Sequence, residues 1–97
     1  MLTLVVTGRL DRYVDYLRGL GITKQEADLK YRYVVDTRSF VGRDRKETKV
    51  IFLANWYDFM QRRDADELQT VALSLFGREN VSYVGSGSIH RHREDGG

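Results

Sequence analysis

The chain has 97 residues, of which 41% are hydrophobic and 31% charged, and its net charge is +2. A chain of this length can form one domain around one modest hydrophobic core. It contains no cysteine, which excludes disulfides and thiolate chemistry, and it has no apolar run approaching the ~20 residues that a membrane-spanning helix needs.

The N-terminal part of the chain predicts a strand followed by an amphipathic helix. Leu2–Val6 is a short apolar run, typical of a strand that is buried on both faces. Apolar side chains then recur every three or four residues over Arg9–Leu20, which predicts a helix with one apolar stripe. Thr23 and Glu26 have the spacing of a capping box, so we expect a short turn of helix over Lys24–Glu26.

The middle of the chain predicts two further strands with an exposed connection. Tyr31–Val35 is rich in aromatic and β-branched residues, as strands are. Ser39–Gly42 suits one helical turn, and the charged segment Gly42–Lys46 suits an exposed loop. Lys49–Ala54 is the most apolar run of the protein, so we expect it to be a central strand. The aromatic segment Trp56–Met60 follows it as a turn or a short helix.

The C-terminal part predicts a second long helix, a last strand and a tail. The segment Asp64–Glu67 combines a capping aspartate with acidic residues that favour a helix N-terminus, so we expect a helix over Ala65–Phe76. Val81–Val84 is a short fourth strand. We expect one domain over residues 1–86 and a flexible basic tail over residues 87–97, where apolar side chains are few.

This order of elements predicts a small Rossmann-like α/β fold, a three-layer sandwich of about four mostly parallel strands with two main helices. The connection of residues 36–48 barely reaches the dozen residues that a parallel crossover needs, so an antiparallel second and third strand is the alternative. The expected core consists of Leu4, Val6, Val14, Leu17, Val34, Ile51, Leu53, Leu68, Val71, Leu75 and Val84.

Parallel strands collect their carboxyl ends at one edge of the sheet, where α/β proteins bind ligands. Thr7, Gly8 and Arg9 follow the first strand there, and with Thr37 they are the candidate phosphate-binding residues. The chain has no G-x-G-x-x-G and no G-x-x-x-x-G-K-[ST] motif, and a single glycine at this position most often serves only the turn itself.

No catalytic or metal-binding set stands out in the sequence. Asp36 and Asp58 each follow a strand and could meet at the carboxyl edge, but aspartate also forms turns and caps routinely. His90 and His92 lack a third ligand with fixed spacing. We therefore expect no catalytic residue, no metal and no cofactor.

The aromatic segment after the central strand is the most unusual part of the sequence. Trp56 and Tyr57 are of the residue types that are enriched at protein interfaces, although the same residues could close the edge of the core. Beside Arg62 and Arg63 the aromatic side chains could also stack on bases of a nucleic acid. Together with neighbouring cations they define the predicted binding surface, which comprises Arg9, Arg38, Trp56 and Tyr57, with Arg43, Arg45 and Lys46 of the basic loop at its rim.

Three segments, Tyr31–Val34, Ser39–Gly42 and Val50–Tyr57, together resemble small uncharacterised α/β proteins encoded by bacteriophages of actinobacteria. The resemblance covers about a third of the chain and carries no catalytic signature. It implies a phage accessory or host-takeover protein that works in the cytoplasm of the bacterial host by binding a host protein.

The predicted function is that of a non-enzymatic interaction protein acting through protein–protein contact. Its partner would be another protein or a second copy, which the edge strand Val81–Val84 could pair with. Nucleotide or phosphate binding is the alternative. Nucleic-acid binding through Arg43, Arg45, Lys46 and the tail is a further one. The chain begins with a strand rather than the basic and apolar segments of a signal peptide, so we expect a cytoplasmic protein.

Overall fold

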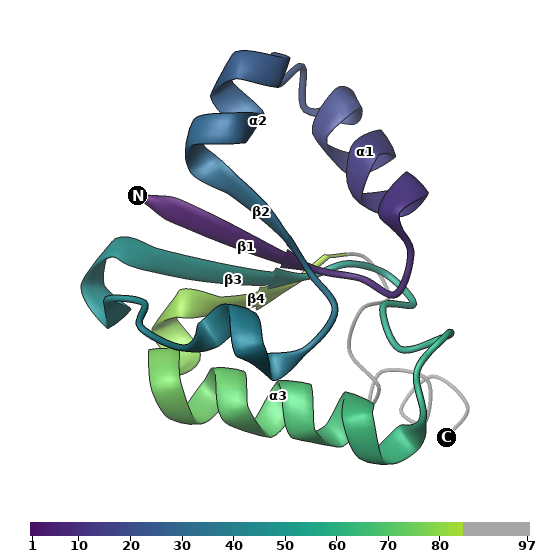
Figure 1. Ribbon diagram of the computed structural model, residues 1–97, viewed down its shortest axis with the longest axis vertical. Helices are drawn as coiled ribbons and strands as arrows, with labels where there is room; N and C mark the ends of the chain where they lie inside the picture. Colours follow the sequence, from purple (N-terminus) through teal and green to yellow (C-terminus); the bar gives the residue numbers. More distant parts are fainter. Residues whose placement is uncertain (85–97) are drawn as a thin grey trace.

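The computed structural model describes residues 1–84, which form a four-stranded sheet between helices (Figure 1). The strands are β1 (Leu2–Val6), β2 (Tyr31–Val34), β3 (Thr48–Phe52) and β4 (Val81–Tyr83), in the spatial order β2-β1-β3-β4. All neighbouring pairs are parallel. The prediction of a small, parallel α/β fold is confirmed, and the antiparallel alternative for the second and third strands is wrong.

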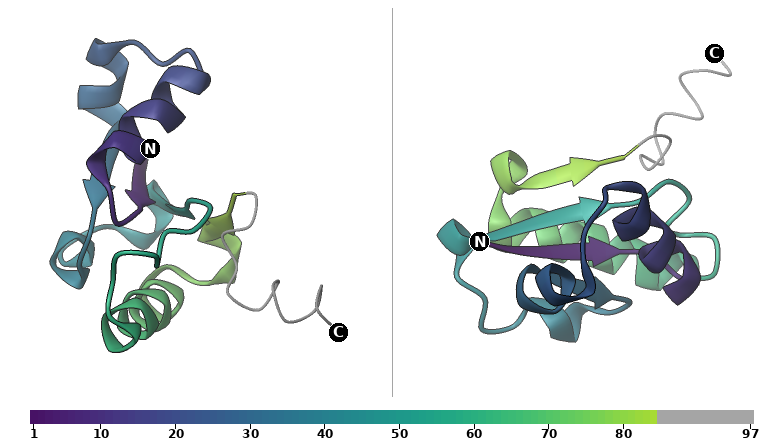
Figure 2. Two further views of the ribbon diagram at one scale, coloured as in Figure 1. Left: turned by 90° about the vertical axis from the view of Figure 1, so that its right-hand side faces the viewer. Right: turned by 90° about the horizontal axis from the view of Figure 1, so that it is seen from above.

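Helices lie on both faces of this sheet. α1 (Leu10–Gly19) and α2 (Lys24–Lys30) connect β1 to β2 on one face, and α3 (Arg62–Phe76) connects β3 to β4 on the other (Figures 1 and 2). The connection from β2 to β3 contains two short 3-10 helices, Thr37–Phe40 and Arg45–Glu47, of which both contact α3. The crossover therefore forms without a long helix.

The core lies between the sheet and α3. Along β3 the side chains of Thr48, Val50 and Phe52 are buried toward α3, whereas Lys49 between them is exposed. Phe40 from the first 3-10 helix packs edge-on against Phe76 of α3, with 5.6 Å between ring centroids. The buried cluster consists of Leu4, Val6, Val34, Phe40, Val50, Phe52, Trp56, Ala65, Leu68, Ala72 and Phe76.

The layer formed by α1 and α2 is thinner than the sequence predicts. Leu17 is the buried residue of α1, and α2 contributes none. Val14, which we expected in the core, is 40% exposed. Amphipathic spacing identifies the apolar side of a helix, but how much of that side is covered depends on the neighbouring elements.

The remaining core predictions divide in the same way. The predicted core residues that are buried are Leu4, Val6, Leu17, Val34, Leu53 and Leu68. Those that are only partly buried are Ile51, Val71 and Val84. Leu75 is exposed, because the buried stripe of α3 runs through Ala65, Leu68, Ala72 and Phe76 and leaves it at the margin.

Two helix boundaries also differ from the prediction. α2 continues to Lys30, and α3 begins at Arg62, three residues earlier than expected. Asp64 consequently lies within the first turn of α3 rather than at its N-cap, a position where its charge still favours the helix. No helix within residues 1–84 is long and apolar enough to cross a bilayer. The predicted tail over residues 87–97 lies outside the described residues, as do His90 and His92.

Candidate functional site

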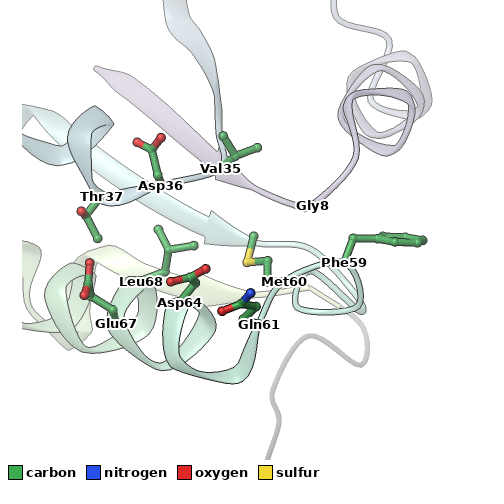
Figure 3. Close-up of a pocket in the computed structure, with 10 residues that line it drawn as sticks. All are labelled: Gly8, Val35, Asp36, Thr37, Phe59, Met60, Gln61, Asp64, Glu67 and Leu68. Carbon is green, nitrogen blue, oxygen red and sulfur yellow. The ribbon is translucent and has the colours of Figure 1, made fainter.

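The carboxyl ends of β1 and β2 and the first half of α3 enclose a pocket of about 390 Å³ (Figure 3). The turn after β1, the segment after β2 and the loop that leads from β3 into α3 all reach it. Its lining residues are Gly8, Val35, Asp36, Thr37, Phe59, Met60, Gln61, Asp64, Glu67 and Leu68. The pocket is therefore at the sheet edge where the sequence predicts a binding surface.

Gly8 allows the β3–α3 loop to close over the turn after β1. A Cβ atom at this position would lie 3.3 Å from the Cβ of Phe59 and 3.3 Å from the backbone oxygen of Trp56. Contacts this short leave little room for any larger residue. The loop also contacts α1, because Nη1 of Arg12 donates to the backbone oxygen of Ala54 at 3.4 Å.

Three successive turns shape the loop itself. The backbone nitrogens of Trp56, Asp58 and Met60 each donate to the carbonyl three residues earlier, at 3.1 Å in every case. Asn55 adopts a φ of 58°, in the left-handed region that asparagine tolerates better than most residues. This path decides which of the clustered aromatic side chains face the core.

Trp56 faces inward. Its side chain is 0% exposed, and its ring centroid lies 4.6 Å from that of Phe52 and 5.5 Å from that of Tyr57, both in edge-to-face geometry. Tyr57 is half-buried against the same cluster. Of the interpretations of the aromatic segment, closure of the core therefore describes Trp56, and this side chain offers no surface to a partner.

Phe59 faces outward instead. Its side chain is 61% exposed at one end of the pocket, and its ring points away from the pocket (Figure 3). The guanidinium carbon of Arg9 lies 5.2 Å from the centre of the ring, within the range of a cation–π contact. Phe59 belongs to the unusual aromatic segment, but the segment has no regular spacing from which its inward and outward residues could be identified in the sequence.

The predicted phosphate-binding residues converge only in part. Gly8 and Thr37 line the pocket, but Thr7 is buried, and its Oγ1 lies 3.5 Å from the backbone nitrogen of Arg9 as a hydrogen-bond acceptor. The side chain of Arg9 forms an ion pair with Asp11 at 2.9 Å. Both the turn and its cation are thus engaged within the protein.

Carboxylates dominate the charge of the pocket. Asp36, Asp64 and Glu67 line it, and its ten lining residues include no lysine or arginine. A hydrogen bond from Arg38 lowers the pKa of Asp36, which is therefore ionised at neutral pH. A phosphate in this pocket would be repelled by these charges. Asp58 does not line the pocket, so the suggested pair of Asp36 and Asp58 does not form there.

The basic loop lies apart from the pocket. Arg45 and Lys46 belong to the 3-10 helix Arg45–Glu47, which directly precedes β3, so they lie at the amino end of that strand, opposite the carboxyl edge (Figure 1). Arg45 pairs with Glu79 at 2.9 Å, and this hydrogen bond lowers the pKa of Glu79. Nε of Arg43 donates to the backbone oxygen of Ser39 at 3.1 Å. The single surface predicted from the sequence is therefore divided, since Arg9 and Arg38 follow strands whereas Arg45 and Lys46 precede one.

In the part of the chain that is described, no group of three or more histidine, cysteine, aspartate or glutamate side chains could hold a metal ion. Comparison of the chain with protein-family models, curated proteins and solved structures yields no match.

Proposed function

We propose that this protein is a non-enzymatic interaction protein that binds another protein at the carboxyl edge of its sheet, with Phe59 as the central contact. The observation that carries the proposal is the 61% exposure of Phe59 beside Arg9. Burying an exposed phenylalanine on a partner contributes about 1.5–3 kcal/mol. Aromatic residues and arginine are also enriched among the residues that dominate binding energy.

The neighbourhood of Phe59 supports the same function. Val35 is exposed and Met60 half-buried, and both line the pocket together with Phe59, so three apolar side chains gather at this part of the surface. Grouped apolar side chains at a surface are more informative than scattered ones. A side chain of the partner would fill the pocket while a second one covers the ring of Phe59.

The charges of this edge favour protein contact over phosphate. The carboxylates of the pocket repel phosphate, and Arg9 and Arg38 are each paired with a neighbouring carboxylate. Binding through apolar contact should change little with salt, whereas nucleic-acid binding falls steeply as salt increases. The experiment on this surface therefore has to distinguish protein binding from nucleotide binding and nucleic-acid binding.

The resemblance to small actinobacteriophage proteins supports a particular partner. We accordingly propose a phage accessory or host-takeover protein that acts in the host cytoplasm on a host protein. The exposed aromatic contact at Phe59 is compatible with such a role.

The proposal is tested by affinity capture from an actinobacterial extract with three forms of the protein. Wild type should retain a partner, and Phe59→Ala should lose it. The matched control is Leu29→Ala, because Leu29 is also a large exposed apolar residue, at 76%, but lies on α2 at the amino edge. Equal recovery with wild type and Phe59→Ala would contradict the proposal. Stabilisation by nucleotides in a thermal-shift assay would favour the alternative.

A further inference from the structure

A second exposed apolar surface lies on α1, none of whose residues lines the pocket at the carboxyl edge. Leu10 and Val14 are 57% and 40% exposed, although both belong to the apolar stripe that ends in the buried Leu17. Figure 2 (left) views the molecule from the side on which α1 lies. This ridge of α1 therefore has apolar side chains that the protein itself does not cover.

A groove continues from this ridge. It has a volume of about 460 Å³ and lies between α1 and α2. Val14 and Leu17 form its wall on the α1 side, and Ile22 and Ala27 contribute from the segment that follows. An apolar side chain projecting from another surface would fit beside Val14.

The charged residues beside Leu10, Val14 and Leu17 have a pattern that indicates what binds to this surface of α1. Leu10, Val14 and Leu17 recur at i, i+4 and i+7, which is the spacing of a helix–helix seam. Asp11 and Arg18 are seven residues apart, so they occupy equivalent positions along one flank of that seam. Both are exposed and opposite in sign.

Such a flank is complementary to itself. When two copies of one helix pair antiparallel about a two-fold axis, each flank meets the same flank of the other copy with its direction reversed. Asp11 of each copy then faces Arg18 of the other, and the axis passes near Val14. In a parallel pair this flank would lie against the opposite flank of the other helix, and Asp11 would not face Arg18, so the pattern favours the antiparallel pair.

We propose that α1 is the interface of a symmetric dimer, in which the helices of two copies pack antiparallel and Leu10 of each copy enters the α1–α2 groove of the other. Asp11 already accepts hydrogen bonds from Arg9 and from the backbone of Arg12. An ionised carboxylate has about four acceptor positions, so it can also accept from Arg18 of the second copy. The interface is only as long as α1, and dimerisation is therefore weak and reversible.

Sedimentation equilibrium from micromolar to millimolar protein tests this arrangement. Wild type should pass from monomer to dimer, and Val14→Lys should raise the dissociation constant at least about tenfold, which is ~1.4 kcal/mol. Val41→Lys is the control, because Val41 is exposed in the loop between the two 3-10 helices, and it should dimerise like wild type.

Charge reversal tests the orientation of the helices. Asp11→Arg and Arg18→Asp should each weaken the dimer, because each creates two like-charged pairs across the axis. The double variant should recover most of the lost affinity. Failure of the double variant to recover would overturn the antiparallel arrangement, as would a dimer indifferent to Val14→Lys.

The wild-type protein provides a measurement that needs no variant to fold. In a dilution series followed by amide NMR spectra, concentration-dependent shifts should be confined to α1 and the facing part of α2. A protein that stays monomeric at millimolar concentration, or shifts that centre on β4 or Phe59, would overturn the proposal. Because Phe59 is not part of this interface, loss of partner capture in the Phe59→Ala variant is a separate result.

Discussion

Replacing Trp56 by alanine should destabilise the protein severely, although this residue has the side chain type most expected at an interface. Its ring is fully buried and packs edge-to-face on Phe52, at the carboxyl end of a central strand. Burying an aromatic side chain removes about 150–250 Å² from water, which at ~25 cal/mol per Å² amounts to roughly 4–6 kcal/mol. Tryptophan-to-alanine substitutions in cores cost about 3–5 kcal/mol.

That loss is large compared with the total stability of a domain this size, about 5–15 kcal/mol. It should lower the melting temperature by more than ~12 °C, since each kcal/mol corresponds to about 4–8 °C. Urea denaturation followed by far-UV circular dichroism measures the change without relying on the fluorescence of the residue removed. A loss below about 1 kcal/mol would refute the inward placement of Trp56.

Three further predictions separate surface contact, backbone conformation and burial. Phe59→Ala should lose partner capture while losing less than about 1 kcal/mol of stability, since its ring is mostly exposed, and Leu29→Ala should lose neither. Gly77→Ala should lower the free energy of unfolding, measured by urea denaturation, by more than ~1 kcal/mol, because the φ of Gly77 is 80°. The control Gly19→Ala in α1 should be neutral or stabilising, because the added Cβ would have no atom within 4 Å. Burial raises the pKa of Tyr83, so the free energy of unfolding should fall as the pH rises above about 10 and through that raised pKa. The Tyr83→Phe variant should show a smaller fall, and an identical pH profile for both proteins would contradict the burial of Tyr83.

The sheet could be predicted because its strands are short apolar runs separated by helical patterns. Leu2–Val6 and the run that contains β3 pair with each other at the centre, where both faces need apolar side chains. The carboxyl edge follows from that topology. The positions of Arg45 and Lys46 could have been inferred as well, because residues that directly precede a parallel strand belong to its amino end.

The inward and outward aromatic residues could not be predicted. Between Asn55 and Met60 the chain follows three overlapping turns rather than a helix or a strand, so no periodicity separates Trp56 from Phe59. Their orientations depend on how the loop closes over Gly8, a contact between residues distant in sequence. Val14 is a second example, because its exposure depends on how far α1 and α2 cover the sheet.

Photo-crosslinking tests the central claim most directly. A photoreactive phenylalanine derivative placed at position 59 should form a covalent adduct with a protein of the host extract, because position 59 lies at the proposed contact. The same derivative at position 29, exposed on α2, should form none. Equal adducts at both positions, or an adduct only at position 29, would contradict protein binding at the carboxyl edge.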